Sequence, residues 1–300
     1  MHAIAIDFGG TKIEEILCSD EGKILYKTRH PTGADKNSSV VISNIAKVIA
    51  DAENFAVKNK ISVKGIGISH PGFTMPGGKI SSCENIPSLM GVDLRKELEK
   101  RLPKYKNKII LENDADCFAL AEYKFGSARK HRTKNIIGVI VGTGLGFGLI
   151  LGGKPFHGSF GGAGEFGHSF FEKPTKTKEG TFEGHASGPW LEKRYKIFGG
   201  SDKSITIMNM FGSKDRTAQN VIELFYDDLG KVLSYVINML NPEVVVIGGG
   251  VSRSIDYKRL RKKVEKYTYK THMNGLKILK HSISDSAGAL GAAVLVFGDV

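Results

Sequence analysis

Short apolar runs that end in glycine or acidic residues recur along the chain, and each run predicts a buried strand that leads into a turn. The first run, residues 3–6, reaches Asp7 and the turn 8–11, and the strand-like run 13–17 returns from it. Residues 23–28 predict a third antiparallel strand. Further strands are predicted over 64–69, 108–111, 136–141, 147–151 and 244–247.

Apolar positions spaced three and four residues apart predict helices between these strands. Val41, Ile45 and Val48 belong to such a stripe, and apolar positions between 221 and 240 mark a long helix. Shorter helices are predicted around Leu94, over 117–125 and over 287–296, and the last is rich in small residues that suit close packing. Strands that alternate with helices indicate an α/β fold.

The opening pattern of strand, glycine turn and returning strand occurs a second time, over residues 136–151, with its glycine turn at 142–146. The simplest interpretation is a duplicated lobe, with a nucleotide bound between the two copies. A chain of 300 residues is long enough for two lobes with cores of their own.

The composition and charge of the chain exclude several classes of protein. Hydrophobic residues make up 41% of the chain and charged residues 25%, and the chain shows neither a leader peptide nor an apolar run long enough for a membrane. Cys18, Cys83 and Cys117 lie far apart, which fits a reducing cytoplasm rather than a disulfide framework. The net charge of +12 comes from scattered lysines without a basic stripe, so we expect nucleotide substrates and no nucleic-acid partner.

The first glycine turn carries groups that suit phosphate. Backbone N–H groups at Gly9 and Gly10, the Thr11 hydroxyl and the Lys12 ammonium can all donate to phosphate oxygens. Asp7, at the strand end, can hold a hydrated Mg²⁺. An ordinary hairpin turn is the alternative, and Lys12 is equally well explained as a solvated strand-end charge.

Two other glycine clusters invite a nucleotide-binding interpretation that their sequence alone does not establish. Residues 162–167 match the spacing of a dinucleotide fingerprint, but no strand precedes them and no helix follows, so we reject a Rossmann site. Residues 248–250 can lie flat under a nucleobase or form a tight strand-to-helix turn.

Taken in order, these motifs resemble those of the ROK family (repressors, open reading frames and sugar kinases). The resemblance covers essentially the whole chain and is carried by residues 7–12, 71–72, 112–115, 142–148, 164–168 and 247–250. It implies the actin-like, ribonuclease-H-like ATPase fold, with duplicated mixed sheets in two lobes that close over sugar and ATP. We expect a small lobe of 1–114 with the C-terminal helix 286–300, and a large lobe of 115–285.

The resemblance also implies roles for individual residues. The implied nucleotide ligands come from two phosphate loops and an adenosine-side turn: Gly9, Gly10, Thr11, Lys12, Gly142, Thr143, Gly144, Gly249 and Gly250. The implied sugar ligands are Asn85, Asn113, Asp114, Glu165, His168 and Glu183. Among these, Asp114 is the implied catalytic base.

One departure from the family pattern concerns zinc. The resemblance implies a cysteine-rich zinc motif after His168, but residues 173–183 contain no cysteine, and Thr181 stands at the place of the last one. Glu183 still matches the sugar-binding glutamate. Because the thiolates that select zinc are missing, we expect no zinc site, and another group must fix the tautomer of His168.

Several side chains have a plainer alternative. Asp114 is the general base or the N-cap of a helix that starts near Ala115, and the two roles are compatible. Asp116 is expected to be a structural or surface group. His168 is favoured as a ligand over a core histidine, and His70 and His185 are expected to be loop residues.

The sequence thus predicts a cytoplasmic, homodimeric kinase that uses ATP and Mg²⁺ to phosphorylate the 6-hydroxyl of a hexose such as glucose or N-acetylglucosamine. A fructokinase or N-acetylmannosamine kinase is an alternative, as is polyphosphate as donor. From a different class, a non-catalytic sugar-binding regulator stays open. A DNA-binding repressor is disfavoured because the first strand starts at Ala3, which leaves no helix-turn-helix before it.

Overall fold

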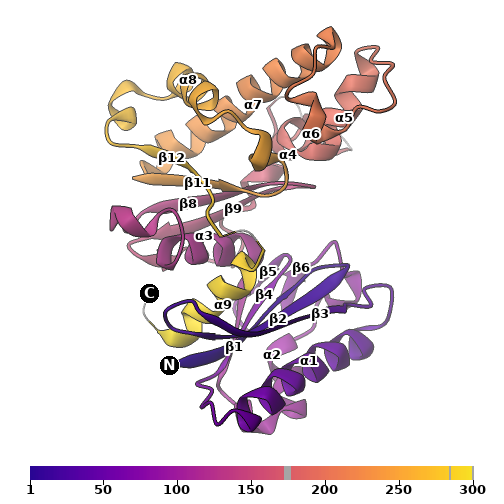
Figure 1. Cartoon of the computed structure of the whole chain (residues 1–300), viewed down its shortest axis with the longest axis vertical. Coiled ribbons are helices and arrows are strands. Elements are labelled where there is room, and N and C mark those ends of the chain that lie inside the picture. The colour runs from indigo at the N-terminus through magenta and orange to yellow at the C-terminus, as the bar shows by residue number, and fades with distance from the viewer. Residues whose placement is uncertain (172–176, 284, 299–300) are drawn as a thin grey trace. The chain divides into compact units, whose positions relative to one another are not determined.

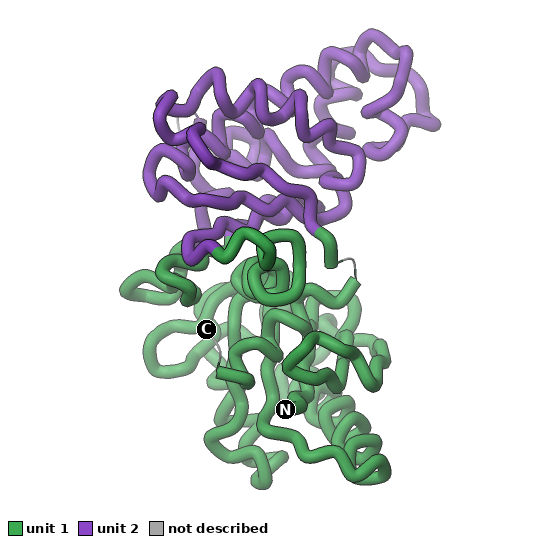
Figure 2. The backbone as a smooth tube through the Cα atoms, turned by 60° about the vertical axis from the view of Figure 1, so that its left-hand side comes forward, with its two compact units in different colours: residues 1–132, 148–163, 282–300 green, residues 133–147, 164–281 purple. Residues whose placement is uncertain are grey.

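The computed structural model describes residues 1–171, 177–283 and 285–298. Figure 1 shows strands gathered into two separate sheets with helices packed on them. The chain forms two compact units (Figure 2): a first unit of residues 1–132, 148–163 and 282–300, and a second unit of 133–147 and 164–281. The first unit contains the helix that begins at Asp114, whereas the motif-based division puts that helix in the large lobe; that division stays a prediction.

The first sheet has the strand order β3-β2-β1-β4-β7 and confirms the predicted hairpin and third strand. β1 pairs antiparallel with β2, β2 with β3, and β4 lies parallel to both β1 and β7. The strands are β1 (His2–Phe8), β2 (Lys12–Ser19), β3 (Ile24–Pro31), β4 (Ile66–His70) and β7 (Ile109–Asn113), with a small ribbon of β5 (Phe73–Thr74) and β6 (Ile80–Ser82).

Both faces of the central strands β1 and β4 are buried, which explains why these strands are apolar without alternation, whereas the edge strand β3 is partly exposed. Ile4 and Ile6 of β1 share one core with α1 (Ser38–Lys58) and α2 (Leu94–Arg101), whereas Ala3 and Ala5 share another with α3 (Asp114–Lys124) and α9 (Ala287–Phe297). Small residues let the last two helices approach closely: a Cβ at Gly291 would lie 1.8 Å from the Cys117 carbonyl oxygen. The close packing predicted for residues 287–296 is therefore confirmed.

The second sheet has the order β10-β9-β8-β11-β12 and repeats the mixed character of the first. β11 lies parallel to β8 and β12, and β10 is antiparallel to β9. The strands are β8 (Ile136–Val141), β9 (Leu145–Leu151), β10 (Lys154–Pro155), β11 (Val244–Gly248) and β12 (Lys277–Lys280).

Helices of the second unit surround the long helix that the sequence predicted, α7 (Arg216–Leu240). It packs against α4, α5, α6 and α8. These are α4 (Phe182–Ala186), α5 (Gly188–Ile197), α6 (Ile207–Met210) and α8 (Tyr257–Tyr267). Its Asp215 N-cap accepts from the N–H of Ala218, which fixes where the helix begins.

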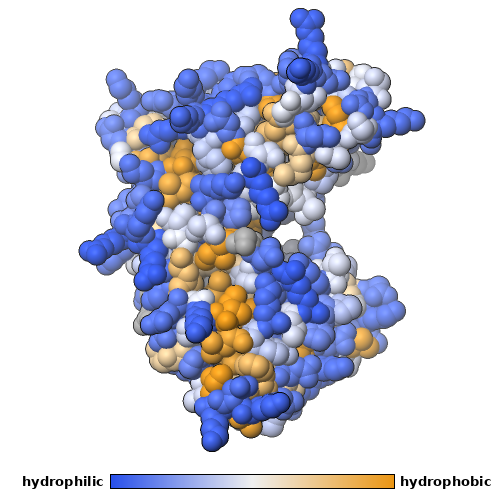
Figure 3. Space-filling view, viewed as in Figure 1, coloured by the Kyte–Doolittle hydropathy of each residue, from blue (hydrophilic) through white to orange (hydrophobic). Residues whose placement is uncertain are grey.

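The visible surface is mostly hydrophilic (Figure 3), as 43 basic and 31 acidic residues lead one to expect. Among the described residues, no helix combines the length and apolarity that a membrane crossing requires. All three cysteines are buried free thiols.

Candidate active site

The first glycine loop is a tight hairpin turn between β1 and β2. The N–H of Gly9 donates to the Lys12 carbonyl at 3.0 Å, and the Thr32 hydroxyl donates to the Gly9 carbonyl at 2.6 Å. A Cβ at Gly10 would lie 2.9 Å from the carbonyl oxygen of Asn85. The fold therefore brings Asn85 against the loop, although 75 residues of chain separate it from Gly10.

Asp7 lies at the end of β1 and is held from two sides. The Ser69 hydroxyl donates to its Oδ1 at 2.7 Å, and a Cβ at Gly288, in the first turn of α9, would lie 2.5 Å from its carboxyl carbon. Burial raises the pKa of Asp7, which the Ser69 hydrogen bond opposes. A buried carboxylate of this kind fits a hydrated Mg²⁺, because the cation offsets the cost of burying the charge.

Asn113 ends β7 and is the N-cap of α3. Its Oδ1 accepts from the N–H groups of Ala115 and Asp116 at 2.9 and 3.2 Å, and its Nδ2 donates to the Gly72 carbonyl at 2.8 Å. Asp114 is the first residue of the helix, so the alternative that made Asp114 the cap is wrong. Its carboxyl group, half-buried in the first helical turn, lies where the helix dipole stabilises an anion.

Asp116 is a buried structural group and not a surface one. It is 3% exposed, and its Oδ1 accepts from the N–H of Leu149 at 2.8 Å. Burial raises the pKa of Asp116 well above its usual value, and the nearby charge of Glu112 adds to this effect. Asp116 thus joins α3 to β9 through this hydrogen bond, two residues along the chain from Asp114, and its role is structural.

The expectation that His70 is a loop residue is wrong, because it is fully buried in β4. Its Nε2 lies 3.0 Å from the Thr74 hydroxyl, and burial lowers its pKa, so the ring is neutral. His70 lines a cavity of about 290 Å³ together with Glu112, Asn113 and His157. Of the predicted site residues, Asn113 therefore lies at this cavity.

In the second unit, the glycine loop between β8 and β9 contacts Glu183. The Glu183 Oε2 accepts from the N–H of Leu145 at 3.1 Å, and a Cβ at Gly144 would lie 2.6 Å from that oxygen. The other carboxylate oxygen pairs with the Lys178 ammonium at 3.0 Å. No motif in the sequence points to Lys178, whose ammonium group neutralises an implied sugar ligand.

His168 and Glu165 pair with each other in a short 3₁₀ turn of residues 165–168. The Nε2 of His168 lies 3.3 Å from the Glu165 Oε2, and this contact raises the pKa of His168. The two side chains are 49% and 40% exposed, so both remain accessible to a ligand. Glu165 is therefore one group that orients the His168 ring.

The segment expected to lack zinc is only partly described, since residues 173–176 lie outside the described residues. Thr181, at the position of the last implied cysteine, is the N-cap of α4: its hydroxyl accepts from Gly184 at 3.0 Å and donates to the Lys178 carbonyl at 2.7 Å. Phe182 packs edge-on against Phe166 at 4.9 Å between ring centroids. Capping and aromatic packing thus hold residues 177–187.

Gly249 and Gly250 follow β11 and lead into a 3₁₀ turn of residues 251–254. Gly249 has φ +85°, and a Cβ there would lie 2.4 Å from the Val141 carbonyl oxygen, whereas nothing lies within 4 Å of a Cβ at Gly250. The turn brings one glycine against β8 and leaves the other open. The open position at Gly250 suits a ligand that approaches the backbone closely, whereas Gly249 is required by its packing against β8.

His185 is not a loop residue either, because it lies in α4. Its Nδ1 lies 3.1 Å from the Asp228 Oδ2 and 2.7 Å from Arg194. Arg194 donates to the same carboxylate at 2.8 Å. These contacts make His185 part of a structural network on α4, α5 and α7.

Comparison with known proteins agrees with this geometry. A glucokinase of Thermotoga maritima is 31% identical, over 99% of this chain and 97% of that protein, and an N-acetyl-D-glucosamine kinase of Aliivibrio fischeri is 31% identical, over 98% of each. The crystal structure of a ROK family glucokinase from Streptomyces griseus, in complex with glucose and AMPPNP, matches with a TM-score of 0.79 and 25% identity, over 98% of this chain and 99% of that one.

These likenesses confirm the expected actin-like α/β fold with two mixed sheets. The model of the ROK family matches residues 3–298, which is nearly the whole chain. The chain therefore belongs to the ROK family.

Proposed function

We propose that this protein is a hexose kinase that transfers the γ-phosphoryl group of ATP to the 6-hydroxyl of glucose or N-acetylglucosamine. The observation that carries the proposal is Asp114 in the first turn of α3, with its preceding residue Asn113 bonded to the Pro71–Gly72 turn. Relatives named glucokinase and N-acetyl-D-glucosamine kinase, each 31% identical over nearly the full length, support this class of reaction.

In the proposed mechanism, Asp114 accepts the proton of the sugar hydroxyl as its oxygen bonds to the γ-phosphorus and the bond to the β-phosphate oxygen breaks. Asn85, Asn113, Glu165, His168 and Glu183 bind the sugar. N–H groups of residues 9–12 and 142–144 bind phosphate oxygens, and Gly249 and Gly250 lie on the adenosine side. Asp7 would hold a hydrated Mg²⁺, which would supply positive charge to neutralise the phosphates.

Further parts of the proposal follow from family membership. We propose that the enzyme needs no zinc, because Thr181 caps α4 where the zinc motif would require a cysteine. A location in the cytoplasm fits the three buried free thiols, and the proposed homodimer rests on family membership alone. A fructokinase or N-acetylmannosamine kinase would use the same catalytic groups.

ADP release across a panel of glucose, N-acetylglucosamine, fructose, mannose and N-acetylmannosamine tests the proposal. We expect ATP- and Mg²⁺-dependent turnover with at least one of these sugars, and its 6-phosphate as product. Parallel reactions with polyphosphate in place of ATP, followed by the formation of sugar phosphate, identify the donor. If no sugar is phosphorylated with either donor while a sugar still shifts the melting temperature, the protein is a non-catalytic sugar-binding regulator.

A further inference from the structure

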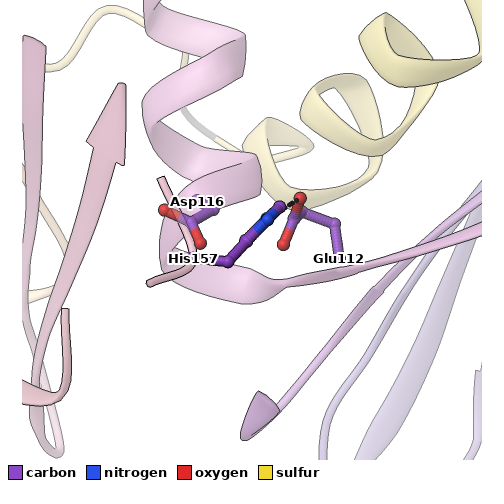
Figure 4. A group of neighbouring side chains, drawn as sticks. All are labelled: Glu112, Asp116 and His157. Atoms are coloured by element: carbon purple, nitrogen blue, oxygen red, sulfur yellow. Dashed lines mark hydrogen bonds and ion pairs between the residues drawn. The ribbon is translucent and has the colours of Figure 1, made fainter. Parts of the chain in front are cut away.

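Glu112, Asp116 and His157 form a cluster in the first unit that the proposed reaction does not use. Figure 4 shows the three side chains turned toward one another: Glu112 from the end of β7, Asp116 from α3 and His157 from the loop after β10. One ligand atom from each, two carboxylate oxygens and an imidazole nitrogen, lie within 4.8 Å of one another. We propose that this cluster binds a divalent first-row transition-metal ion.

Each carboxylate is oriented by the backbone. The Glu112 Oε1 accepts from the N–H of Asn113 at 2.8 Å, and its Oε2 lies 2.8 Å from His157 Nε2. The Asp116 Oδ1 accepts from the N–H of Leu149 at 2.8 Å. One oxygen of each group is thus held by an N–H, and the Glu112 Oε2 faces the imidazole that would be its fellow ligand, as in protein sites whose ligands are oriented by hydrogen bonds.

Charge balance in the cluster favours a cation. Glu112 and Asp116 are only 6% and 3% exposed, yet the cluster offers a single imidazole to balance two carboxylates. A bound divalent ion would neutralise both carboxylates and take the place of the protons that otherwise balance them.

A path to the cluster exists on one side. Glu112 and His157 line the cavity of about 290 Å³, and the His157 side chain is 48% exposed. Three protein ligands leave coordination positions for water on the cavity side. Such an ion exchanges with solvent, unlike one enclosed by four protein ligands.

The ligand set indicates the kind of metal. Imidazole together with carboxylates suits Zn²⁺, Co²⁺ or Mn²⁺, and affinity rises from Mn²⁺ to Co²⁺. Magnesium favours oxygen ligands and retains its waters, so it competes poorly for a site with an imidazole. The site is therefore distinct in chemistry from the magnesium held through water at Asp7.

Titration of the chelator-treated, full-length protein with Co²⁺ tests the proposal without any measurement of kinase turnover. We expect one saturable equivalent, detected by calorimetry and by the visible absorption of bound Co²⁺, that survives a large excess of Mg²⁺. His157→Asn should weaken binding by at least about tenfold, and Glu112→Gln, which can still accept from Asn113, should do the same.

His30→Asn is the matched control, because this imidazole of the same unit contacts the hydroxyl of Thr28. It should leave the Co²⁺ affinity unchanged. Melting temperatures without metal show whether each variant is folded. No saturable binding, or equal Co²⁺ affinity in wild type, His157→Asn and Glu112→Gln, would overturn the proposal and leave the cluster as a shared-proton network.

Discussion

The side-chain amide of Asn113 donates to the carbonyl of Gly72 at 2.8 Å, while its oxygen caps α3. One residue thus joins the Pro71–Gly72 turn to the helix that begins with Asp114. Any displacement of that turn is transmitted to the first helical turn through this amide. The position of Asp114 therefore depends on neighbours in both strand and helix.

Asn113→Ala should lower the free energy of unfolding by about 2 kcal/mol, from a lost cap of about 1 and a lost hydrogen bond of about 1. Asn113→Asp keeps an oxygen for the cap but loses the donor to Gly72, so about half of that loss should remain. Urea unfolding of both variants measures the difference. Equal stability in the two variants would mean that the cap contributes nothing, and wild-type stability in Asn113→Asp would mean that the bond to Gly72 contributes nothing.

Gly72→Ala should be strongly destabilising, because φ is +78° and the new Cβ would lie 1.5 Å from the Ser82 carbonyl oxygen. Gly77→Ala is the matched control: its φ is +102°, but nothing lies within 4 Å of its Cβ. The control should show only the cost of backbone strain, about 1 kcal/mol. Thermal melts should separate the pair, and similar melting temperatures would count against the described Pro71–Gly72 turn.

The raised pKa of Glu15 should make the free energy of unfolding depend on pH. Burial raises its pKa from 4.5 to about 7, with Thr28 donating to it at 2.8 Å. Because the pKa of Glu15 is higher in the folded state than in the unfolded state, the protonated side chain contributes to the stability of the fold. This contribution is fully present below pH 4.5 and is lost as pH rises through 7.

Glu15→Gln cannot ionise and should escape that loss. Relative to wild type, the variant should therefore gain about 3 kcal/mol between pH 4.5 and pH 8.5, as judged by urea unfolding at each pH. Glu21→Gln, on the exposed turn after β2, is the control. A stability difference between Glu15→Gln and wild type that does not change with pH would contradict the raised pKa.

The sequence predicted β1, β4, β8 and β11, because these strands are buried apolar runs. It did not predict the short or half-exposed strands β5, β6, β10 and β12. The prediction failed where the burial of a residue depends on its contacts with segments that are distant in the sequence. His70 follows an apolar strand and precedes Pro71, which is typical of a loop, but the ribbon of β5 and β6 covers it. His185 carries no periodic signal, and its partner Asp228 lies 43 residues away.

The capping residue of α3 was also misassigned, since Asp and Asn both cap well and only the backbone shows that the helix starts at Asp114. Glu112 belongs to the motif of residues 112–115, but the family resemblance implies no role for it. His157 lies in a glycine-rich loop whose sequence shows no pattern typical of a metal ligand. The loop that carries His157 also packs closely at Gly161, where a Cβ would lie 2.3 Å from the Thr74 carbonyl oxygen. Contacts of this range leave no pattern in a single sequence.

Zinc content provides a further prediction. Chelator-treated protein should keep full kinase activity and contain no stoichiometric zinc by elemental analysis, because residues 173–183 include no cysteine. An exchangeable ion at the cluster of Glu112, Asp116 and His157 would be removed by the same treatment. One tightly held zinc per chain that resists the chelator would contradict this prediction.

Asp114→Asn, assayed with the preferred sugar, tests the central proposal most directly. The substitution preserves size and leaves the Asn113 cap in place, but the new side chain cannot accept a proton. We expect kcat to fall by at least about 10²-fold with little change in sugar affinity, since general-base catalysis is typically worth about 10²–10⁴. Asp116→Asn, which can still accept from Leu149, should keep kcat within about tenfold of wild type. Loss of turnover in Asp116→Asn together with wild-type kcat in Asp114→Asn would show that Asp114 is not the base.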